Sequence, residues 1–344
     1  MATVILRRGE ERRLTAGHPW VWRTEIAAIR GSFQPGDIVE VVDHRGRFLG
    51  RGYINPASQI TVRLLTRHRS EEIDAEFWRR RLRAAWEYRQ TVLRGAATDS
   101  CRVVFAEADF LPGLIVDKFG PYLVVQTLTL GIDRHKDLLV ATLDELLAPD
   151  GIYERNDVAV RELEGLTQET GFLKGPFDPL VTISENGLQL YVDIARGQKT
   201  GYFLDQRENR AALRPLVQGA RVLDAFCHTG SFALHAARYG AREVLGLDIS
   251  AEAVELARRN AHLNGLTDRC TFEVANAFDA LRQLVQAGER FDVVILDPPA
   301  FVKSRKALEG AIRGYKEINL RAMKLLNPGG FLVTCSCSYH LSED

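Results

Sequence analysis

The chain has 344 residues, of which 46% are hydrophobic and 26% are charged, and its 45 basic and 45 acidic side chains give a formal net charge of +0. This length suffices for two or three domains that each bury a hydrophobic core. No apolar run approaches the ~20 residues that a membrane helix needs, and the N-terminus lacks the apolar segment of a signal peptide. We therefore expect a globular protein without a membrane anchor, located in the cytoplasm.

The cysteines are odd in number and include no C-x-x-C pair. The sequence thus indicates neither a disulfide framework nor a paired-cysteine zinc site. A metal site built from Cys335, Cys337 and His340 has no evident fourth ligand, so we expect free thiols and no metal. The cysteines are Cys101, Cys227, Cys270, Cys335 and Cys337.

Positive charge is concentrated near the N-terminus. Residues 1–70 contain twelve arginines, no lysine and six acids, a net charge of +6, so the remaining residues carry −6. Positive charge supplies the sequence-independent part of nucleic-acid affinity, and arginine offers a planar fork to phosphate. A solvated arginine-rich surface is the alternative, and charge alone does not separate the two.

The same segment has the pattern of a small β-barrel. Its short apolar or alternating runs are separated by turn residues and lie at 4–7, 38–42, 47–53 and 60–65. Trp20 and Trp22 stand beside basic residues, as in a base-stacking surface. We favour the alternative, in which both rings fill the inside of the barrel.

Residues 71–190 combine helical spacing with short apolar runs, and this pattern predicts an α+β module. Residues 71–94 have the spacing of a long amphipathic helix. Short apolar runs follow, then a helical stretch at 134–147 and a hairpin at 180–194 around Asn186-Gly187. This region contains no catalytic constellation, and we interpret it as a spacer that orients the flanking domains.

From residue 191 to 344, strands and helices alternate as in a doubly wound, Rossmann-like α/β fold. The expected helices lie at 232–239 and 251–264. The expected strands lie at 221–224, 243–247, 270–274, 291–296 and 331–334.

The loop after the first of these strands indicates which nucleotide the fold binds. It contains one glycine, Gly230, where a dinucleotide fingerprint needs three. Asp224 at the strand end suits the ammonium group of S-adenosylmethionine, and Asp248 at the end of the next strand suits the two ribose hydroxyls. Alternatively, both carboxylates are helix caps.

Two short strings follow later strands and predict chemistry on a nucleobase. Asp297-Pro298-Pro299-Ala300-Phe301 and Thr334-Cys335-Ser336-Cys337-Ser338 each come directly after an apolar run. Because the carboxyl ends of parallel strands line one crevice, the acid and the thiol can converge on one substrate atom.

Several strings together resemble the RlmI-like family of large-subunit ribosomal RNA cytosine-C5 methyltransferases. They are G-Q-K-T-G-Y-F-L-D-Q-R at 197–207, the Asp224 loop, D-P-P-A-F at 297–301, R-G-Y-K-E-I-N at 313–319 and S-C-S at 336–338. The resemblance spans nearly the whole chain. It implies a PUA domain at 1–70, a central α+β module at 71–190 and a class I methyltransferase domain at 191–344.

The resemblance also implies roles for individual residues. S-adenosylmethionine would be the cofactor, and large-subunit ribosomal RNA or its assembly intermediate the partner, with a homodimer as one assembly. Cys337 and Asp297 would be catalytic. The implied cofactor-binding residues are Phe203, Gln206, Asp224, Phe226, Gly230, Asp248, Asn276 and Asp297. The implied substrate-binding residues are Pro298, Pro299, Phe301, Lys303 and Tyr315.

Cytosine C5 becomes nucleophilic once a thiolate adds to C6, so this activity requires a cysteine near the base. The family's Ser-Cys-Ser pattern favours Cys337 over Cys335, which would be a second thiol or packing. Two other functions stay open, a methyltransferase for an exocyclic base amine and an inactive RNA-binding assembly factor. The chain stops soon after the fifth strand, and we expect its methyltransferase domain to be C-terminally incomplete.

Overall fold

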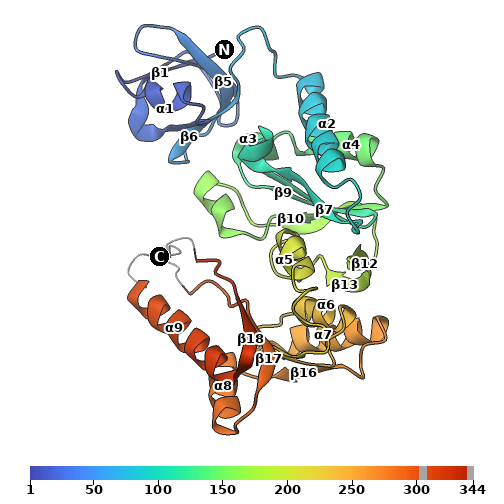
Figure 1. Cartoon of the computed structure of the whole chain (residues 1–344). Coiled ribbons are helices and arrows are strands. Elements are labelled where there is room, and N and C mark those ends of the chain that lie inside the picture. The colour runs from blue at the N-terminus through green and yellow to red at the C-terminus, as the bar shows by residue number, and fades with distance from the viewer. Residues whose placement is uncertain (302–307, 339–344) are drawn as a thin grey trace. The chain divides into compact units, whose positions relative to one another are not determined.

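The computed structural model describes residues 1–301 and 308–338, which divide into two compact units (Figure 1). The first unit comprises Met1–Val181 and Val192–Tyr202, and the second comprises Thr182–Tyr191 and the residues from Phe203 onward. The hairpin of β12 (Leu180–Glu185) and β13 (Leu188–Asp193) contributes residues to both units. The finer division at residues 70 and 190 stays a prediction.

The N-terminal part of the first unit is a six-stranded sheet with the order β2-β6-β5-β4-β1-β3. The pairing of β1 with β4 is parallel and the other pairings are antiparallel. The elements are β1 (Thr3–Leu6), α1 (Glu11–Thr15), β2 (Trp20–Trp22), η1 (Arg23–Glu25), β3 (Ile26–Arg30), β4 (Ile38–Val42), β5 (Phe48–Ile54) and β6 (Ile60–Thr66).

The two tryptophans of β2 do not fill the inside of this sheet. Side chains alternate along a strand, and it is Val21, with 0% exposure, that enters the core. Trp20 and Trp22 lie half-buried on the opposite face, with their ring centroids 6.2 Å apart. The interpretation of both rings as core packing is therefore wrong, because the strand register gives the interior position to the residue between them.

The rest of the first unit is a five-stranded sheet with the order β11-β10-β9-β8-β7, covered by helices. Helix α2 begins after Asp74, whose side chain accepts a hydrogen bond from Phe77 N at 2.8 Å, and it buries Phe77, Trp78 and Leu82 in the core. The elements are α2 (Ala75–Val92), β7 (Cys101–Phe105), η2 (Ala106–Asp109), β8 (Leu114–Phe119), β9 (Tyr122–Thr127), α3 (Leu130–Asp133), α4 (Lys136–Leu147), β10 (Gly151–Arg155), η3 (Ala159–Glu164) and β11 (Thr170–Lys174).

A cluster of three acids in this unit is neutralised by two basic side chains. Asp133, Glu154 and Glu169 bring their carboxylate oxygens within 4.8 Å of one another. Lys136 Nζ donates to Glu154 and to Glu169 at 2.8 Å, and the Arg161 guanidinium contacts Asp133 at 2.8 Å and Glu169 at 3.0 Å. Lys136 and Arg161 thus supply the positive charge that a metal ion would supply to these carboxylates. We therefore interpret the cluster as an ion-pair network.

The second unit is built on a five-stranded parallel sheet with the order β16-β15-β14-β17-β18. The chain order reverses at β14, which is the switch point where open α/β sheets bind ligands. The elements are β12 (Leu180–Glu185), β13 (Leu188–Asp193), η4 (Leu204–Gln206), α5 (Arg207–Ala211), β14 (Arg221–Asp224), α6 (Ser231–Arg238), β15 (Glu243–Asp248), α7 (Ala251–Leu263), β16 (Cys270–Val274), α8 (Ala277–Gln286), β17 (Phe291–Leu296), α9 (Leu308–Leu325) and β18 (Leu326–Thr334).

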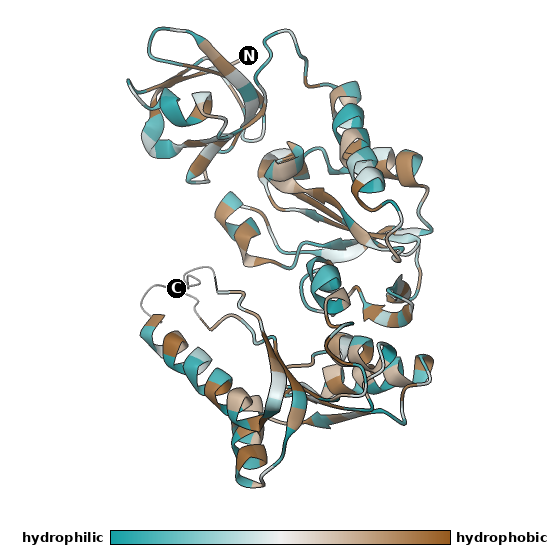
Figure 2. Ribbon diagram, in the orientation of Figure 1, coloured by the Kyte–Doolittle hydropathy of each residue, from teal (hydrophilic) through white to brown (hydrophobic). Residues whose placement is uncertain are grey.

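Helix α9 shows how these helices cover the sheet. Hydrophobic and hydrophilic segments alternate along it (Figure 2), and its buried residues recur every three or four positions. All of them except Ala311 pack with Phe291, Val294 and Leu296 of β17 in one hydrophobic cluster. The buried residues of α9 are Ala311, Tyr315, Ile318, Ala322 and Leu325.

A fully buried ion pair joins the β12–β13 hairpin to α5. Arg210 Nε and Nη2 donate to the Glu185 carboxylate at 2.7 and 3.1 Å, with side-chain exposures of 2% and 1%. Arg210 also donates to the carbonyl oxygen of Phe203 at 2.9 Å. His235 Nε2 lies 3.6 Å from Glu185, and burial lowers the pKa of this imidazole to about 4, so it stays neutral at pH 7. The ion pair orients Arg210, which in turn holds the backbone at Phe203.

Arg210→Met is expected to lower the free energy of unfolding by about 3–5 kcal/mol, because it leaves the Glu185 carboxylate buried without its cation. Urea denaturation measures this change. Arg282→Met on the exposed face of α8 is the matched control and should change stability by less than about 0.5 kcal/mol. The double variant Glu185→Leu/Arg210→Met should regain most of the loss, since it removes both charges. A single variant as stable as the wild type would contradict the argument.

Candidate active site

Three carboxylates lie at the carboxyl ends of neighbouring strands of the second unit. Asp224 ends β14, Asp248 ends β15 and Asp297 follows β17. Asp224 is 1% exposed, and its Oδ2 accepts a hydrogen bond from Ala233 N at 3.0 Å. Within the residues that the structure describes, its Oδ1 has no hydrogen-bond partner. Burial, and then the charge of Asp297, raise the pKa of Asp224 to about 8.

Asp248 holds the neighbouring loop and the start of α7. Its Oδ2 accepts from His228 N at 2.8 Å and its Oδ1 accepts from Ser250 N at 2.9 Å. Ser250, and not Asp248, is the N-cap of α7, since its Oγ accepts from Ala253 N at 3.2 Å. Asp248 is therefore not a helix cap. Asp224 does accept a hydrogen bond from the first turn of α6, but only through one of its two oxygens.

The loop after β14 requires its single glycine. Gly230 has a φ of +83°, and a Cβ there would lie 2.9 Å from the Phe272 ring and 3.0 Å from Ala257 Cβ. The Phe226 ring in this loop is half-buried and lies 6.5 Å from the Phe278 ring. The Phe203 ring lies 5.7 Å from that of His228 in an edge-on contact. The structure thus brings Phe203 and Phe226 to the loop at Asp224.

Two other predicted cofactor residues lie at the surface. Gln206 is half-buried in η4, and its Oε1 accepts from Asn209 Nδ2 at 2.6 Å. Asn276 is exposed and is the N-cap of α8, with its Oδ1 accepting from Phe278 N at 3.0 Å. An amide oxygen has two lone pairs, so Asn276 can still accept one further hydrogen bond.

The acid string and the thiol string lie side by side. β17 and β18 are parallel neighbours with Leu296 opposite Thr334, and Cys335 N donates to the Leu296 carbonyl at 2.8 Å. The Cys337 thiol donates to the carbonyl oxygen of Pro298 at 3.5 Å. Pro298, the residue after Asp297, is therefore in contact with the Cys337 thiol.

The two thiols of this string differ in environment. Cys337 is exposed, whereas Cys335 is half-buried. Burial, and then the charge of Asp297, raise the pKa of Cys335 to about 12, so this thiol stays protonated at neutral pH and is a poor nucleophile.

The chain matches the PUA-like domain family over residues 4–67 and the S-adenosylmethionine-dependent methyltransferase family over residues 168–344. It is 42% identical over 343 residues to ribosomal RNA large subunit methyltransferase I of Salmonella arizonae, covering 99% of this chain and 85% of that protein. It is 43% identical over 339 residues to the protein of the same name from Tolumonas auensis, covering 98% and 85%. The chain belongs to the ribosomal RNA large subunit methyltransferase I family.

Solved structures confirm the fold of this methyltransferase. A SAM-dependent methyltransferase from Streptococcus mutans superposes with a TM-score of 0.80 at 20% identity, covering 99% of this chain and 87% of that chain. A methyltransferase crystallised with SAH, SMU.776, gives a TM-score of 0.83 at 19% identity, covering 100% and 88%. The predicted α/β class I methyltransferase fold with an N-terminal PUA-like domain is confirmed, and S-adenosylmethionine is the cofactor of the family.

The residues at the switch point of the methyltransferase sheet fit this cofactor. S-adenosylmethionine carries an ammonium and a sulfonium, and it donates a methyl group from the latter. The buried, unpartnered Oδ1 of Asp224 can accept from an ammonium. Burial, and then the charges of Asp297 and Asp248, raise the pKa of Asp224, and a bound cation opposes these effects because it favours the charged carboxylate.

Tyr315 of the methyltransferase supports both strings and is not an open surface residue. It is 9% exposed and stacks on Phe301 at 4.6 Å between ring centroids. Its hydroxyl lies 2.9 Å from Ser338 Oγ and accepts from Ser336 Oγ at 3.3 Å, while Phe301 N donates to Ser338 Oγ at 3.1 Å. These contacts let Tyr315 position the loop that carries the thiol, and its direct contact with the substrate stays a prediction.

Tyr315→Phe is expected to lower kcat for methyl transfer between about 10- and 100-fold, because the hydroxyl that holds Ser336 and Ser338 on either side of Cys337 is lost. The affinity for S-adenosylmethionine, measured by calorimetry, should stay unchanged. Tyr88→Phe, at an exposed position of α2, is the matched control. A variant with unchanged kcat would show that packing alone holds the two strings together.

The remaining predicted substrate residues have mixed environments. Pro298 is buried, Pro299 is exposed and Phe301 is half-buried, with its ring 5.7 Å from that of Phe278. Lys303 lies outside the described residues. Their role in binding the target base stays a prediction.

No local sequence pattern indicates the groups that hold the Gly-Gln-Lys-Thr-Gly string at residues 197–201. In the first unit, the Thr200 hydroxyl donates to Asp117 at 2.6 Å, and Arg102 contacts the same buried carboxylate at 2.9 and 3.0 Å. Arg155 donates to the carbonyl oxygens of Ile194 and Gly197 at 2.8 and 3.1 Å. These partners are distant along the chain, so only the folded structure reveals that they fix this string.

Proposed function

We propose that this methyltransferase forms 5-methylcytosine in large-subunit ribosomal RNA. The observation that carries the proposal is the contact of the exposed Cys337 thiol with the Asp297 string, at the carboxyl ends of the neighbouring strands β17 and β18 of a methyltransferase sheet. The names of the relatives supply the class of RNA. The rest of the predicted partners and location, an assembling particle, a homodimer and the cytoplasm, stay predictions. In the part of the chain that the structure describes, no helix is long and apolar enough to span a bilayer.

The covalent chemistry follows from the electronics of cytosine. The Cys337 thiolate adds to C6, and the electron pair of the C5–C6 bond makes C5 nucleophilic. C5 takes the methyl group that the bound cofactor supplies. A base then removes the C5 proton, the C5–C6 double bond re-forms and the thiolate leaves.

The roles of the other residues follow from where they lie. Asp224 and the loop to Gly230, with Phe203, Gln206 and Phe226, would hold the methionine part of the cofactor. Asp248 would hold the ribose and Asn276 would face the adenine. Asp297 would face the target base.

Product analysis tests the proposed function directly. Large-subunit RNA is incubated with the enzyme and isotope-labelled S-adenosylmethionine, digested to nucleosides and analysed by mass spectrometry. We expect the label in 5-methylcytidine. Label in a nucleoside methylated on an exocyclic amine would identify the alternative methyltransferase, and RNA binding without label would identify an inactive assembly factor.

A further inference from the structure

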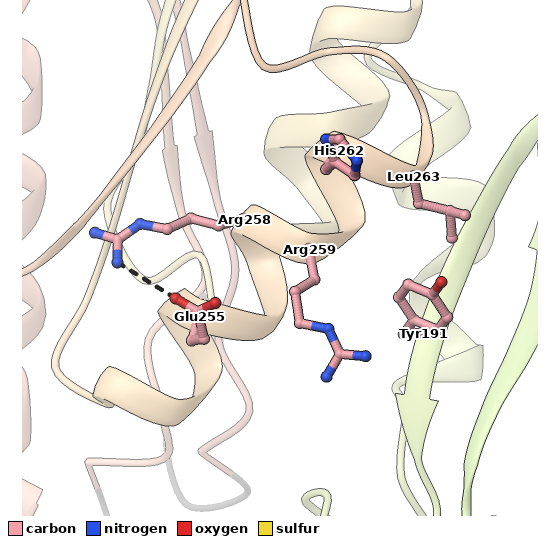
Figure 3. A pocket seen from close by; sticks show the side chains of 6 residues that line it. All are labelled: Tyr191, Glu255, Arg258, Arg259, His262 and Leu263. Atoms are coloured by element: carbon pink, nitrogen blue, oxygen red, sulfur yellow. Dashed lines mark ion pairs between the residues drawn. The ribbon is translucent and has the colours of Figure 1, made fainter.

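A hollow of about 330 Å³ lies on the second unit between Tyr191 of β13 and the side chains of α7 (Figure 3). We call it the α7 pocket. It is lined by Tyr191, Glu255, Arg258, Arg259, His262 and Leu263.

The side chains of the α7 pocket are predominantly basic. Two arginines and a histidine face one acid, and all four are exposed. Arg258 Nη2 donates to the Phe272 carbonyl at 2.7 Å, and its Nη1 lies 3.6 Å from Glu255, so this arginine is oriented and the acid is compensated. The net positive charge of the pocket therefore centres on Arg259.

Arg259 presents an open guanidinium. Its Cζ lies 5.0 Å from the centroid of the Tyr191 ring, which supports the guanidinium from one side. Within residues 1–301 and 308–338, it makes no hydrogen bond or ion pair, so its five N–H donors are available to a ligand. A planar fork of this kind matches the oxygens of a phosphate.

The two walls of the pocket are joined by Asn260 of α7 and by Asn264, which follows the helix directly. Asn260 Oδ1 accepts from Tyr191 N at 2.7 Å. Asn264 accepts from Gln189 N at 2.9 Å and donates to the Gln189 carbonyl at 2.7 Å, as a neighbouring strand would. The pocket is thus pre-formed, and a ligand does not have to order it.

The α7 pocket is distinct from the cofactor site. Helix α7 begins at Ala251, just after the strand end that carries Asp248. Arg258 to His262 follow seven to eleven residues later, which at 1.5 Å per residue is roughly 10–17 Å along the helix axis. The cofactor residues named above do not line it.

We propose that the α7 pocket binds a backbone phosphate of the RNA substrate, with Arg259 as its principal ligand. Its volume is at the lower end of ligand pockets and suits about one nucleotide of a passing single strand. The inference rests on the proposed function, because it takes ribosomal RNA as the ligand. It adds a contact that holds RNA outside the catalytic crevice.

The test compares Arg259→Glu with Arg282→Glu, the same charge reversal at an exposed position of α8. The probe is a fluorescein-labelled single-stranded RNA of roughly 20 nucleotides, and anisotropy gives its Kd from about 50 to about 200 mM KCl. We expect Arg259→Glu to weaken binding about ten-fold and to reduce the slope of log Kd against log salt by about 1. Arg282→Glu should resemble the wild type, and all three proteins should bind S-adenosylmethionine equally.

Each outcome separates this inference from the proposed function. Equal Kd values and slopes for the two variants, or no binding of the RNA by the wild type, would overturn the pocket assignment, even if 5-methylcytidine forms. A selective loss in Arg259→Glu supports the pocket, and if the wild type then forms no 5-methylcytidine, the proposed activity is the part that fails.

Discussion

Replacement of Cys337 by alanine is expected to lower the rate of cytosine methylation by about four orders of magnitude or more, because it removes the group that makes C5 nucleophilic. The fold should be unaffected, since Cys337 is exposed and its thiol makes a long contact, 3.5 Å, with the Pro298 carbonyl. Methyl transfer to large-subunit RNA, measured at saturating cofactor, gives the rate.

Cys335→Ala is the matched control for this experiment. Its thiol lies two residues away on the same string, and its pKa of about 12 keeps it protonated. The strand contact at this position uses the backbone N–H and not the thiol, so the variant should keep its structure and its activity.

RNA that contains 5-fluorocytidine tests the covalent step itself. Fluorine at C5 cannot leave as a proton does, so the sulfur–C6 bond should persist and yield a protein–RNA adduct that survives denaturing electrophoresis. The wild type and Cys335→Ala should form the adduct, and Cys337→Ala should not. An adduct in Cys337→Ala, or none in an active wild type, would contradict the assignment of the nucleophile.

Asp224→Asn is expected to weaken the binding of S-adenosylmethionine roughly 10- to 100-fold, because a buried charge-assisted hydrogen bond to the ammonium is lost. The wild-type affinity should depend on pH. The pKa of Asp224 is about 8 in the free protein, so this carboxyl is protonated at lower pH. Binding of the ammonium then requires the carboxyl to lose its proton. The affinity should therefore rise about ten-fold per pH unit from about pH 6 to about pH 7.5.

Calorimetry across this pH range measures the effect. Asp224→Asn should show a nearly flat profile, and Asp279→Asn, at an exposed position of α8, should retain the wild-type dependence. A wild-type Kd that is constant from about pH 6 to about pH 7.5 would contradict the role of the Asp224 carboxyl.

The same carboxyl predicts the pH dependence of stability. Its pKa is raised from 3.8 to about 8 on folding, so between these values the folded state binds more protons than the unfolded state. The free energy of unfolding should then fall as the pH rises through this window, by up to about 1.4 kcal/mol per pH unit from this group. Asp224→Asn should lack this component in urea denaturation.

The strands of the methyltransferase sheet could be predicted well from the sequence. The predicted ranges 221–224, 270–274 and 291–296 are those of β14, β16 and β17. β14 and β17 are buried over most of their length, so they form nearly continuous apolar runs that end at an acid, whereas the edge strand β16 alternates between buried and exposed residues. β18 begins at Leu326, five residues before the prediction, because Leu326 pairs with Phe291 and the Asn327-Pro328-Gly329-Gly330 residues form an irregularity before the ladder continues at Phe331.

The N-terminal sheet was harder to predict. β2 and β3 were missed, and the face of β2 was misjudged. A three-residue strand has too few side chains to show its alternation, and large aromatic rings suggest burial wherever they stand. The register against β6 decides that Val21 and not Trp20 or Trp22 enters the core.

The sequence by itself determined the α/β methyltransferase fold, the kind of cofactor and the identity of the acid and thiol strings, because these depend on local patterns at strand ends. The tertiary structure decided the environments on which their chemistry depends. Only the packed sheet leaves Asp224 Oδ1 without a partner among the described residues, half-buries Cys335 while Cys337 stays exposed, and directs the Tyr315 hydroxyl to Ser336 and Ser338. Burial and hydrogen bonding between distant residues set pKa values and orientation, and no local sequence pattern encodes them.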